Sequence, residues 1–135
     1  MTDQEILNKS LEHILNQGQS CMDCGRICHE HPTKKLISAF GIHIFPEKID
    51  SSINYQTNIK SIIHYNKKLR WMYPHSEVLQ EIILSSHSNR FIWNNTTNKF
   101  ESISFLEDQI YQYVNIAKRC NIQPPPIAQN FLLLK

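Results

Sequence analysis

Hydrophobic residues near the N-terminus recur three and four residues apart, which is the spacing of one face of a helix. They are Leu7, Leu11, Ile14 and Leu15. Thr2 and Glu5 precede them with the spacing of a capping box, in which a hydroxyl and a carboxylate satisfy free backbone amides. Gly18 follows where the end of a helix favours a left-handed residue. The pattern predicts a helix over residues 3–17.

The middle of the chain repeats this periodicity. One predicted helix begins between residues 51 and 58 and runs to about residue 72, where Pro74 ends it. Its buried side comprises Ile59, Ile62, Ile63 and Leu69. A third helix, over residues 76–86, is capped by Ser76. Its inner residues are Val78, Leu79, Ile82 and Ile83. Before them, the sequence indicates a short helix over residues 34–40 and a short strand over residues 42–45.

Alternating apolar residues on either side of a polar loop predict a β-hairpin over residues 90–103. Ser104 and Glu107 then form a second capping-box pattern. An apolar stripe follows at helical spacing: Leu106, Ile110, Tyr113, Ala117 and Cys120. The prolines at 124–126 end this helix and impose an extended segment. Residues 131–134 are apolar, and they predict a final strand packed on the core or an apolar tail that docks elsewhere.

These elements together predict a mainly α (α+β) fold in a single domain of residues 1–135. Its subregions are an N-terminal helix with a Cys/His cluster (1–45), helices with a hairpin (54–122) and a Pro-rich, apolar tail (123–135). The order helix, turn, helix, hairpin across residues 55–103 has the outline of a winged helix. Residues 76–86 would be its third helix and residues 90–103 its wing.

Composition narrows the class of protein. A chain of 135 residues with 41% hydrophobic and 19% charged residues is typical of a globular domain. Its 14 basic and 12 acidic residues give a formal charge of +2, far from that of a nucleic-acid coat. No segment resembles an export signal or a membrane span. We therefore expect a reducing compartment, cytoplasmic or nuclear, and no membrane partner.

The stretch CMDCGRICHEH carries the most specific chemical signal. Cys21 and Cys24 are three residues apart, and Gly25 tolerates the tight turn with which such a pair binds one zinc ion. A helix that began near Gly25 would place Cys28 on the same face as Cys24. His31 then completes C-x2-C-x3-C-x2-H. Four ligands close the tetrahedron, so the sequence predicts a structural zinc site that resembles a zinc knuckle.

The fourth ligand stays open, because most zinc modules separate their two ligand pairs by a dozen or so residues. Alternatives to His31 are His29, His43 and Cys120. Of these, Cys120 lies on the apolar stripe of the last predicted helix. A buried core cysteine is therefore the simpler interpretation of Cys120.

Two other interpretations of the cluster compete with zinc. Cys21 and Cys24 can form the redox pair of a thiol/disulfide oxidoreductase, of the flavin-linked type that uses a helical bundle. Cys24, Cys28 and His29 form C-x3-C-H, which is one residue longer than the attachment signature of c-type haem. Haem attachment usually requires export, for which the sequence shows no signal.

A second candidate surface combines basic and aromatic residues, which can bind phosphates and stack on a base. Its members are Lys60, His64, Lys67, Lys68, Arg70 and Trp71. An ordinary solvated helix face explains the same residues. Residues 76–86 contain no arginine, which argues against sequence-specific reading of a DNA groove.

No catalytic triad, paired carboxylates or Gly-rich phosphate loop emerges from the sequence. The favoured hypothesis is a non-enzymatic, zinc-stabilised binding module that acts through a protein partner or a larger assembly. A transcription-linked or nucleic-acid-linked role through the basic surface is a second form of the same hypothesis.

Overall fold

The structure of the chain is a computed structural model that describes residues 1–18, 28–30, 35–44, 59, 63, 67–84 and 91–134. For residues 28–30, 35, 91 and 92 it describes the backbone alone. The helices are α1 (Asp3–Gln17), α3 (Ser76–Leu84), α4 (Phe105–Cys120) and α5 (Pro126–Leu133), with 3-10 helices η1 (Gly41–His43) and η2 (Lys67–His75). The strands are β1 (Cys28–Glu30), β2 (Lys35–Ile37), β3 (Phe91–Asn94) and β4 (Lys99–Ser102).

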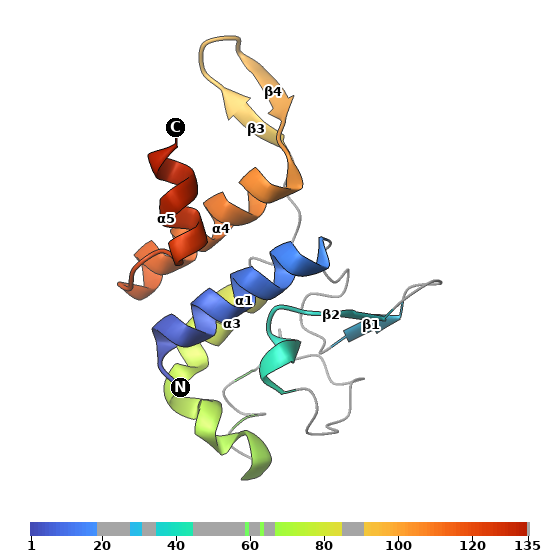
Figure 1. Cartoon of the computed structure of the whole chain (residues 1–135), viewed down its shortest axis with the longest axis vertical. Helices are drawn as coiled ribbons and strands as arrows, with labels where there is room; N and C mark the ends of the chain where they lie inside the picture. The colour runs from blue at the N-terminus through green and yellow to red at the C-terminus, as the bar shows by residue number, and fades with distance from the viewer. Residues whose placement is uncertain are drawn as a thin grey trace.

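The described part of the chain is mainly helical, with two small antiparallel hairpins, β1–β2 and β3–β4 (Figure 1). This confirms the predicted fold class at that level. Among the described residues, no helix combines the length and the apolar character needed to cross a bilayer.

Helix α1 has the bounds that its sequence predicts, because both of its ends are specified locally. The Thr2 hydroxyl accepts a hydrogen bond from the Glu5 amide at 3.1 Å, and the Glu5 carboxylate accepts one from the Thr2 amide at 3.3 Å. At the other end, Gly18 has a φ of 75° and donates its N–H to the Ile14 carbonyl at 2.9 Å. A side chain at that φ would be strained, so glycine suits the position.

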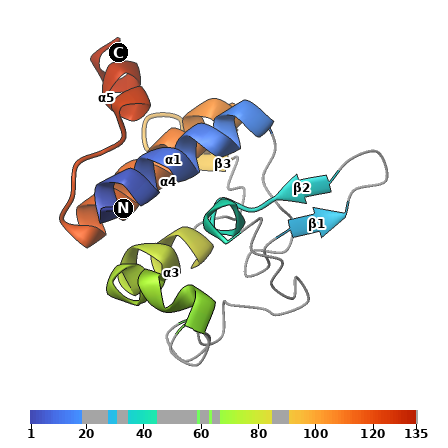
Figure 2. The same cartoon turned by 60° about the horizontal axis from the view of Figure 1, so that its bottom comes forward.

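The core forms where α1 packs against α3 and α4. Figures 1 and 2 show α1 running through the middle of the molecule beside both helices. The buried residues come from all three helices and include Leu7, Leu11, Leu79, Ile83, Ile110 and Ile116. Ile59 and Ile63 join the same cluster in helical backbone, as the second predicted helix requires. One continuous apolar core therefore connects elements distant in the sequence.

Two predictions for residues 34–45 are wrong. Residues 35–37 form strand β2 instead of a helix, because they pair with β1 in antiparallel register, with Cys28 opposite Ile37. Residues 41–43 form 3-10 helix η1 instead of a strand, and the Gly41 amide donates to the Ser38 hydroxyl at 2.8 Å as the turn begins. Cys28 lies in strand β1, so the prediction that a helix beginning near Gly25 contains Cys28 is also wrong.

The predicted end of the second helix differs as well. Residues 67–75 form a 3-10 helix with Pro74 inside it, whereas the sequence predicts an α-helix that Pro74 ends. Helix α3 follows directly and covers residues 76–84 of the predicted 76–86; residues 85 and 86 lie outside the described residues.

The β3–β4 hairpin confirms the predicted strands and polar loop. Phe91 pairs with Ser102 and Asn94 with Lys99, and Asn98 closes the loop at a φ of 56°. In Figure 1 the hairpin projects from one end of the molecule, while η2 lies at the opposite end. The winged-helix outline stays a prediction, without support from the residues that the structure describes.

Helices α4 and α5 form the C-terminal part. The Ser104 hydroxyl accepts a hydrogen bond from the Glu107 amide at 3.1 Å, which confirms Ser104 as the cap of α4. The predicted final strand is wrong, because residues 126–133 form helix α5. Pro126 occupies its first turn, where the fixed φ of proline suits a helix and its missing N–H costs nothing.

Candidate functional site

Of the four predicted zinc ligands, the structure describes only the backbone of Cys28, in β1. Cys21, Cys24 and His31 lie outside the described residues. Cys28 and His29 lie in β1, where the backbone alone is described. Within the described residues, no group of three histidine, cysteine or acidic side chains could hold a metal ion. The zinc site therefore stays a prediction.

Hydrogen bonds fix the β1–β2 hairpin to the C-terminal half of α1. The Ile37 amide donates to Gln17 Oε1 at 3.0 Å, and Gln17 Nε2 donates back to the Ile37 carbonyl at 3.2 Å. His13 Nε2 lies 2.8 Å from the same carbonyl and donates to it, because a carbonyl oxygen only accepts. Since Cys28 pairs with Ile37, the backbone of Cys28 is one strand away from α1.

His43, an alternative ligand, lies at the end of η1 beside the same helix. Its Nε2 is 2.9 Å from the Ser10 hydroxyl, and that hydroxyl is 2.7 Å from the Ile6 carbonyl. The hydroxyl has one proton, which it donates to the carbonyl, so the hydrogen-bond network assigns the ring proton to Nε2. The remaining lone pair of His43 is on Nδ1.

The pKa of His43 lies at about 4 instead of 6.5, and the largest cause is its burial. The positive charge of Lys9 and the neighbouring His13 contribute to the same lowering, while a hydrogen bond with the Ile6 backbone opposes it. His43 is therefore neutral at physiological pH, as a metal ligand must be. The same neutral ring also satisfies the buried Ser10 hydroxyl, which is a purely structural role.

Cys120, the other distant alternative, lies at the far end of α1 from Cys28. Burial raises the pKa of its thiol, and the carboxylates of Glu81 and Asp3 raise it further. Asp3 begins α1, whereas Gln17, which holds the β1–β2 hairpin, ends it. A helix of this length spans about 20 Å. Zinc–sulfur bonds are about 2.3 Å long, so this separation argues against Cys120 and Cys28 as ligands of one ion.

An open depression lies along α1 on the side of His13. It has a volume of roughly 350 Å³ and is lined by Lys9, Glu12, His13 and Asn16.

The Ser10–His43 contact has the distance of a nucleophile–base pair, but Ser10 is fully buried and its proton is already donated. A substrate could not reach that hydroxyl, so this pair does not form a hydrolytic site.

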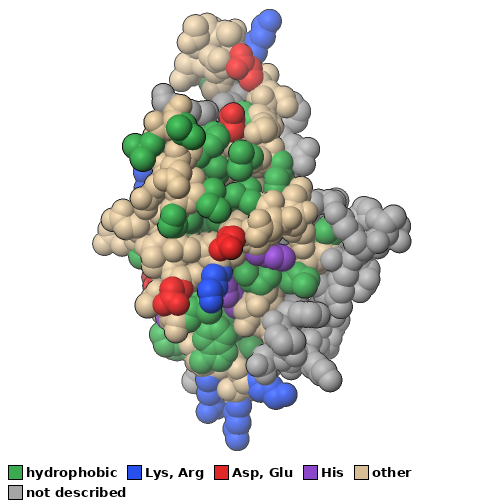
Figure 3. All heavy atoms as spheres, viewed as in Figure 1, with side chains coloured by type: hydrophobic (Ala, Val, Ile, Leu, Met, Phe, Trp, Pro, Cys, Tyr) green, Lys and Arg blue, Asp and Glu red, His purple; other side chains and the backbone are tan. Residues whose placement is uncertain are grey.

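The structure describes four of the six residues of the predicted basic and aromatic surface. Lys60 and His64 lie outside the described residues. Lys67, Lys68, Arg70 and Trp71 are all exposed on η2. Figure 3 shows Lys and Arg side chains gathered at the end of the molecule where Figure 1 places η2. The structure therefore brings these four predicted residues together on one short helix.

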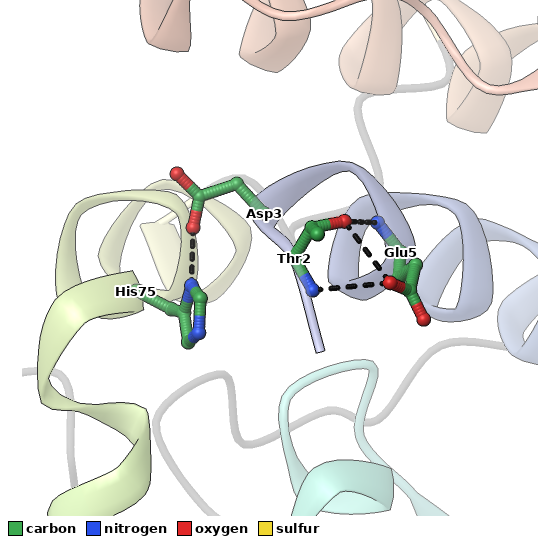
Figure 4. A network of polar contacts seen from close by, with 4 residues as sticks. All are labelled: Thr2, Asp3, Glu5 and His75. Carbon is green, nitrogen blue, oxygen red and sulfur yellow. Dashed lines mark hydrogen bonds and ion pairs between the residues drawn. The ribbon is translucent and has the colours of Figure 1, made fainter.

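Two contacts that the sequence did not predict hold distant segments against the start of α1. His75 Nδ1, at the end of η2, is 2.6 Å from Asp3 Oδ1 (Figure 4). Gln4 Nε2 donates to the Gln123 carbonyl at 2.7 Å, and Gln4 Oε1 accepts from the Gln123 amide at 2.9 Å. These partners are far apart in the sequence, so no local pattern could have identified them.

The far end of α5 is apolar and open to solvent. Leu133 is 84% exposed and Leu134 is 89% exposed, and Leu132 is exposed beside them. We call these three leucines the apolar end. Residues 126–134 contain no charged side chain. Green side chains also gather over the upper half of the face in Figure 3, in the region of α4 and α5.

Comparison of the chain with protein-family models, with curated proteins and with solved structures gives no significant match. The site is therefore interpreted from the chemistry of its own residues.

Proposed function

We propose that this chain is a non-enzymatic binding module in which a structural zinc ion holds the Cys/His cluster. Its proposed ligands are Cys21, Cys24, Cys28 and His31. The spacing C-x2-C-x3-C-x2-H supports the metal, and one observation of the structure indicates what the metal would stabilise. The strand that contains Cys28 is paired to Ile37, and Ile37 is bound by two side chains of α1.

This arrangement would couple the metal to the stability of the whole fold. An ion that fixed Cys28 would also fix β1, and β1 is one strand away from a helix whose inner face is in the core. Binding of structural zinc contributes on the order of 10 kcal/mol in small zinc domains. That is comparable to the entire stability of a typical domain.

Metal content tests the proposal. Native mass spectrometry should find one zinc ion per chain, and a chelator should lower the melting temperature. Cys28→Ser should lose the metal. Cys120→Ser is the matched control and should keep it, because that thiol lies near the opposite end of α1.

A metal-free protein that contained a reversible Cys21–Cys24 disulfide and bound flavin would overturn the zinc proposal in favour of the oxidoreductase. A red protein with covalently bound haem would overturn it in favour of the c-type haem site. A chelator that removed zinc without lowering the melting temperature would contradict the structural role.

The apolar end of α5 supports a protein as the partner. Leu133 and Leu134 are almost fully exposed, and residues 126–134 contain no charged side chain. Contiguous exposed apolar side chains are typical of protein interfaces. The folded protein should therefore bind the dye bis-ANS, and Leu133→Ser with Leu134→Ser should reduce the fluorescence by at least half. Unchanged fluorescence would show that another surface binds the dye and would contradict this interface.

A further inference from the structure

Helix η2 concentrates basic and aromatic side chains at one end of the molecule. Lys67, Lys68 and Arg70 are exposed, as are Trp71 at 43% and Tyr73 at 48%. The η2 sequence, KKLRWMYPH, contains no acidic residue. The whole chain has a charge of only +2, so this positive surface is local.

The 3-10 geometry of η2 sorts these side chains into rows. A 3-10 helix has three residues per turn, so side chains at i and i+3 lie one above the other, about 6 Å apart along the axis. Leu69 and Met72 form the inner row, and both are fully buried. One outer row consists of Lys67, Arg70 and Tyr73, and the other contains Lys68 and Trp71. Each outer row therefore begins with a basic residue and reaches an aromatic one.

We propose that η2 binds single-stranded nucleic acid. Lys67, Lys68 and Arg70 contact successive phosphates, while unpaired bases stack on Trp71 and Tyr73. Aromatic rings stack on the faces of bases, and those faces are accessible in a single strand but covered by neighbours in a duplex. The stacking is independent of sequence because every base has an aromatic face.

The surface is held in place before any ligand arrives, which lowers the entropic cost of binding. Leu69 and Met72 anchor η2 in the core. At its end, His75 contacts Asp3 of α1 (Figure 4). This inference rests on η2 alone, and it goes beyond the proposed protein interface and the zinc site. Its test is therefore informative whatever the metal content of the protein is.

Tryptophan fluorescence locates the binding surface, because the chain has only two tryptophans. Trp93→Phe leaves Trp71 as the reporter, and Trp71→Phe leaves Trp93. Trp93 is a matched control: it is 50% exposed, lies on the β3–β4 hairpin at the other end of the molecule, and packs against Phe100. An oligothymidine of twenty nucleotides should quench the tryptophan fluorescence of Trp93→Phe and leave that of Trp71→Phe unchanged. Equal quenching of both reporters, or quenching of Trp93 alone, would overturn the proposal.

Fluorescence anisotropy with the same labelled oligonucleotide measures the energetics. Three phosphate contacts to a single strand predict a slope of log K against log salt of about −2. Lys67→Gln with Lys68→Gln should make that slope less negative by about 1.4. Trp71→Ala should weaken binding about tenfold. Lys99→Gln with Lys118→Gln removes the same charge from other exposed positions and should have a much smaller effect.

Two further ligands separate this inference from its competitors, and circular dichroism verifies that each variant is folded. The matched duplex and vesicles of phosphatidylcholine with phosphatidylserine should both bind more weakly than the single strand. Tighter binding of the duplex, binding of the vesicles alone, or equal losses in the two double-lysine variants would overturn the proposal.

Discussion

Replacement of His43 should change how the stability of the fold depends on pH. Its pKa is about 4 in the folded chain, whereas an exposed histidine has a pKa of 6.5. The unfolded chain therefore binds a proton at a pH where the folded chain does not. As pH falls below 6.5, the proton stabilises the unfolded state, so stability is lost until pH reaches about 4.

The size of the loss follows from the two pKa values. Between pH 7.5 and pH 5.0, linkage gives a loss of about 2 kcal/mol for one such histidine. Part of the ring is in contact with solvent, and screening there reduces the figure to about 1 to 2 kcal/mol. The neighbours of the ring act in the same direction, because Lys9 and His13 both disfavour its protonation.

Urea denaturation of wild type and His43→Gln at both pH values measures the effect. We expect wild type to lose about 1 to 2 kcal/mol more than the variant between pH 7.5 and pH 5.0. Both proteins retain the proposed ligands Cys21, Cys24, Cys28 and His31, so with that ligand set any loss of metal affects the two alike and cancels in the comparison. Equal losses would refute the reasoning. If the variant does not fold, an NMR titration of the wild-type ring still decides, since a pKa near 6.5 would contradict its burial.

Four further substitutions test the packing and the helix ends by urea denaturation at neutral pH. Gly18→Ala should cost about 1 kcal/mol, because no atom obstructs a new Cβ there and the left-handed backbone alone resists it; an unchanged stability would contradict that backbone. Ser104→Ala should cost about 1 kcal/mol through the lost cap of α4, whereas a stabilised protein would show that the cap is not formed. Leu11→Ala, in the core, should cost about 2 to 5 kcal/mol, while Leu133→Ala, at the exposed end of α5, should change stability by less than about 0.5 kcal/mol. Similar costs for these two leucines would contradict the burial described for them.

The elements that the sequence predicted correctly are those specified by neighbouring residues. Thr2, Glu5 and Gly18 define both ends of α1 within the helix itself. The β3–β4 hairpin is encoded by its own alternation and its polar loop. In each case the interactions that decide the structure lie within the element itself.

Elements that depend on other parts of the chain were missed. Strand β2 exists because it pairs with β1 and is bound by Gln17, and nothing within residues 35–37 reveals those partners. Helix α5 was confused with a strand because a short apolar run suits either. Pro126 at its first turn was the signal that could have identified it.

The candidate surface on η2 was found in part. The sequence predicts Lys67, Lys68, Arg70 and Trp71 on an α-helix, which has a period of 3.6 residues. That period does not align Tyr73 with Lys67 and Arg70, whereas the period of three in η2 does. The change of helix type was therefore the missing information.

The contacts of α1 also bear on the order in which the protein folds. Residues 18–104 separate α1 from its core partner α4 in the sequence. Gln123, which is hydrogen-bonded to Gln4, lies still further along the chain. Closing so long a loop is entropically costly, and chains dominated by such contacts fold slowly. During synthesis on a ribosome, α3 emerges before α4, so only the part of the apolar face of α1 that packs against α4 would wait for that helix. In that interval this part of the face would be available to chaperones.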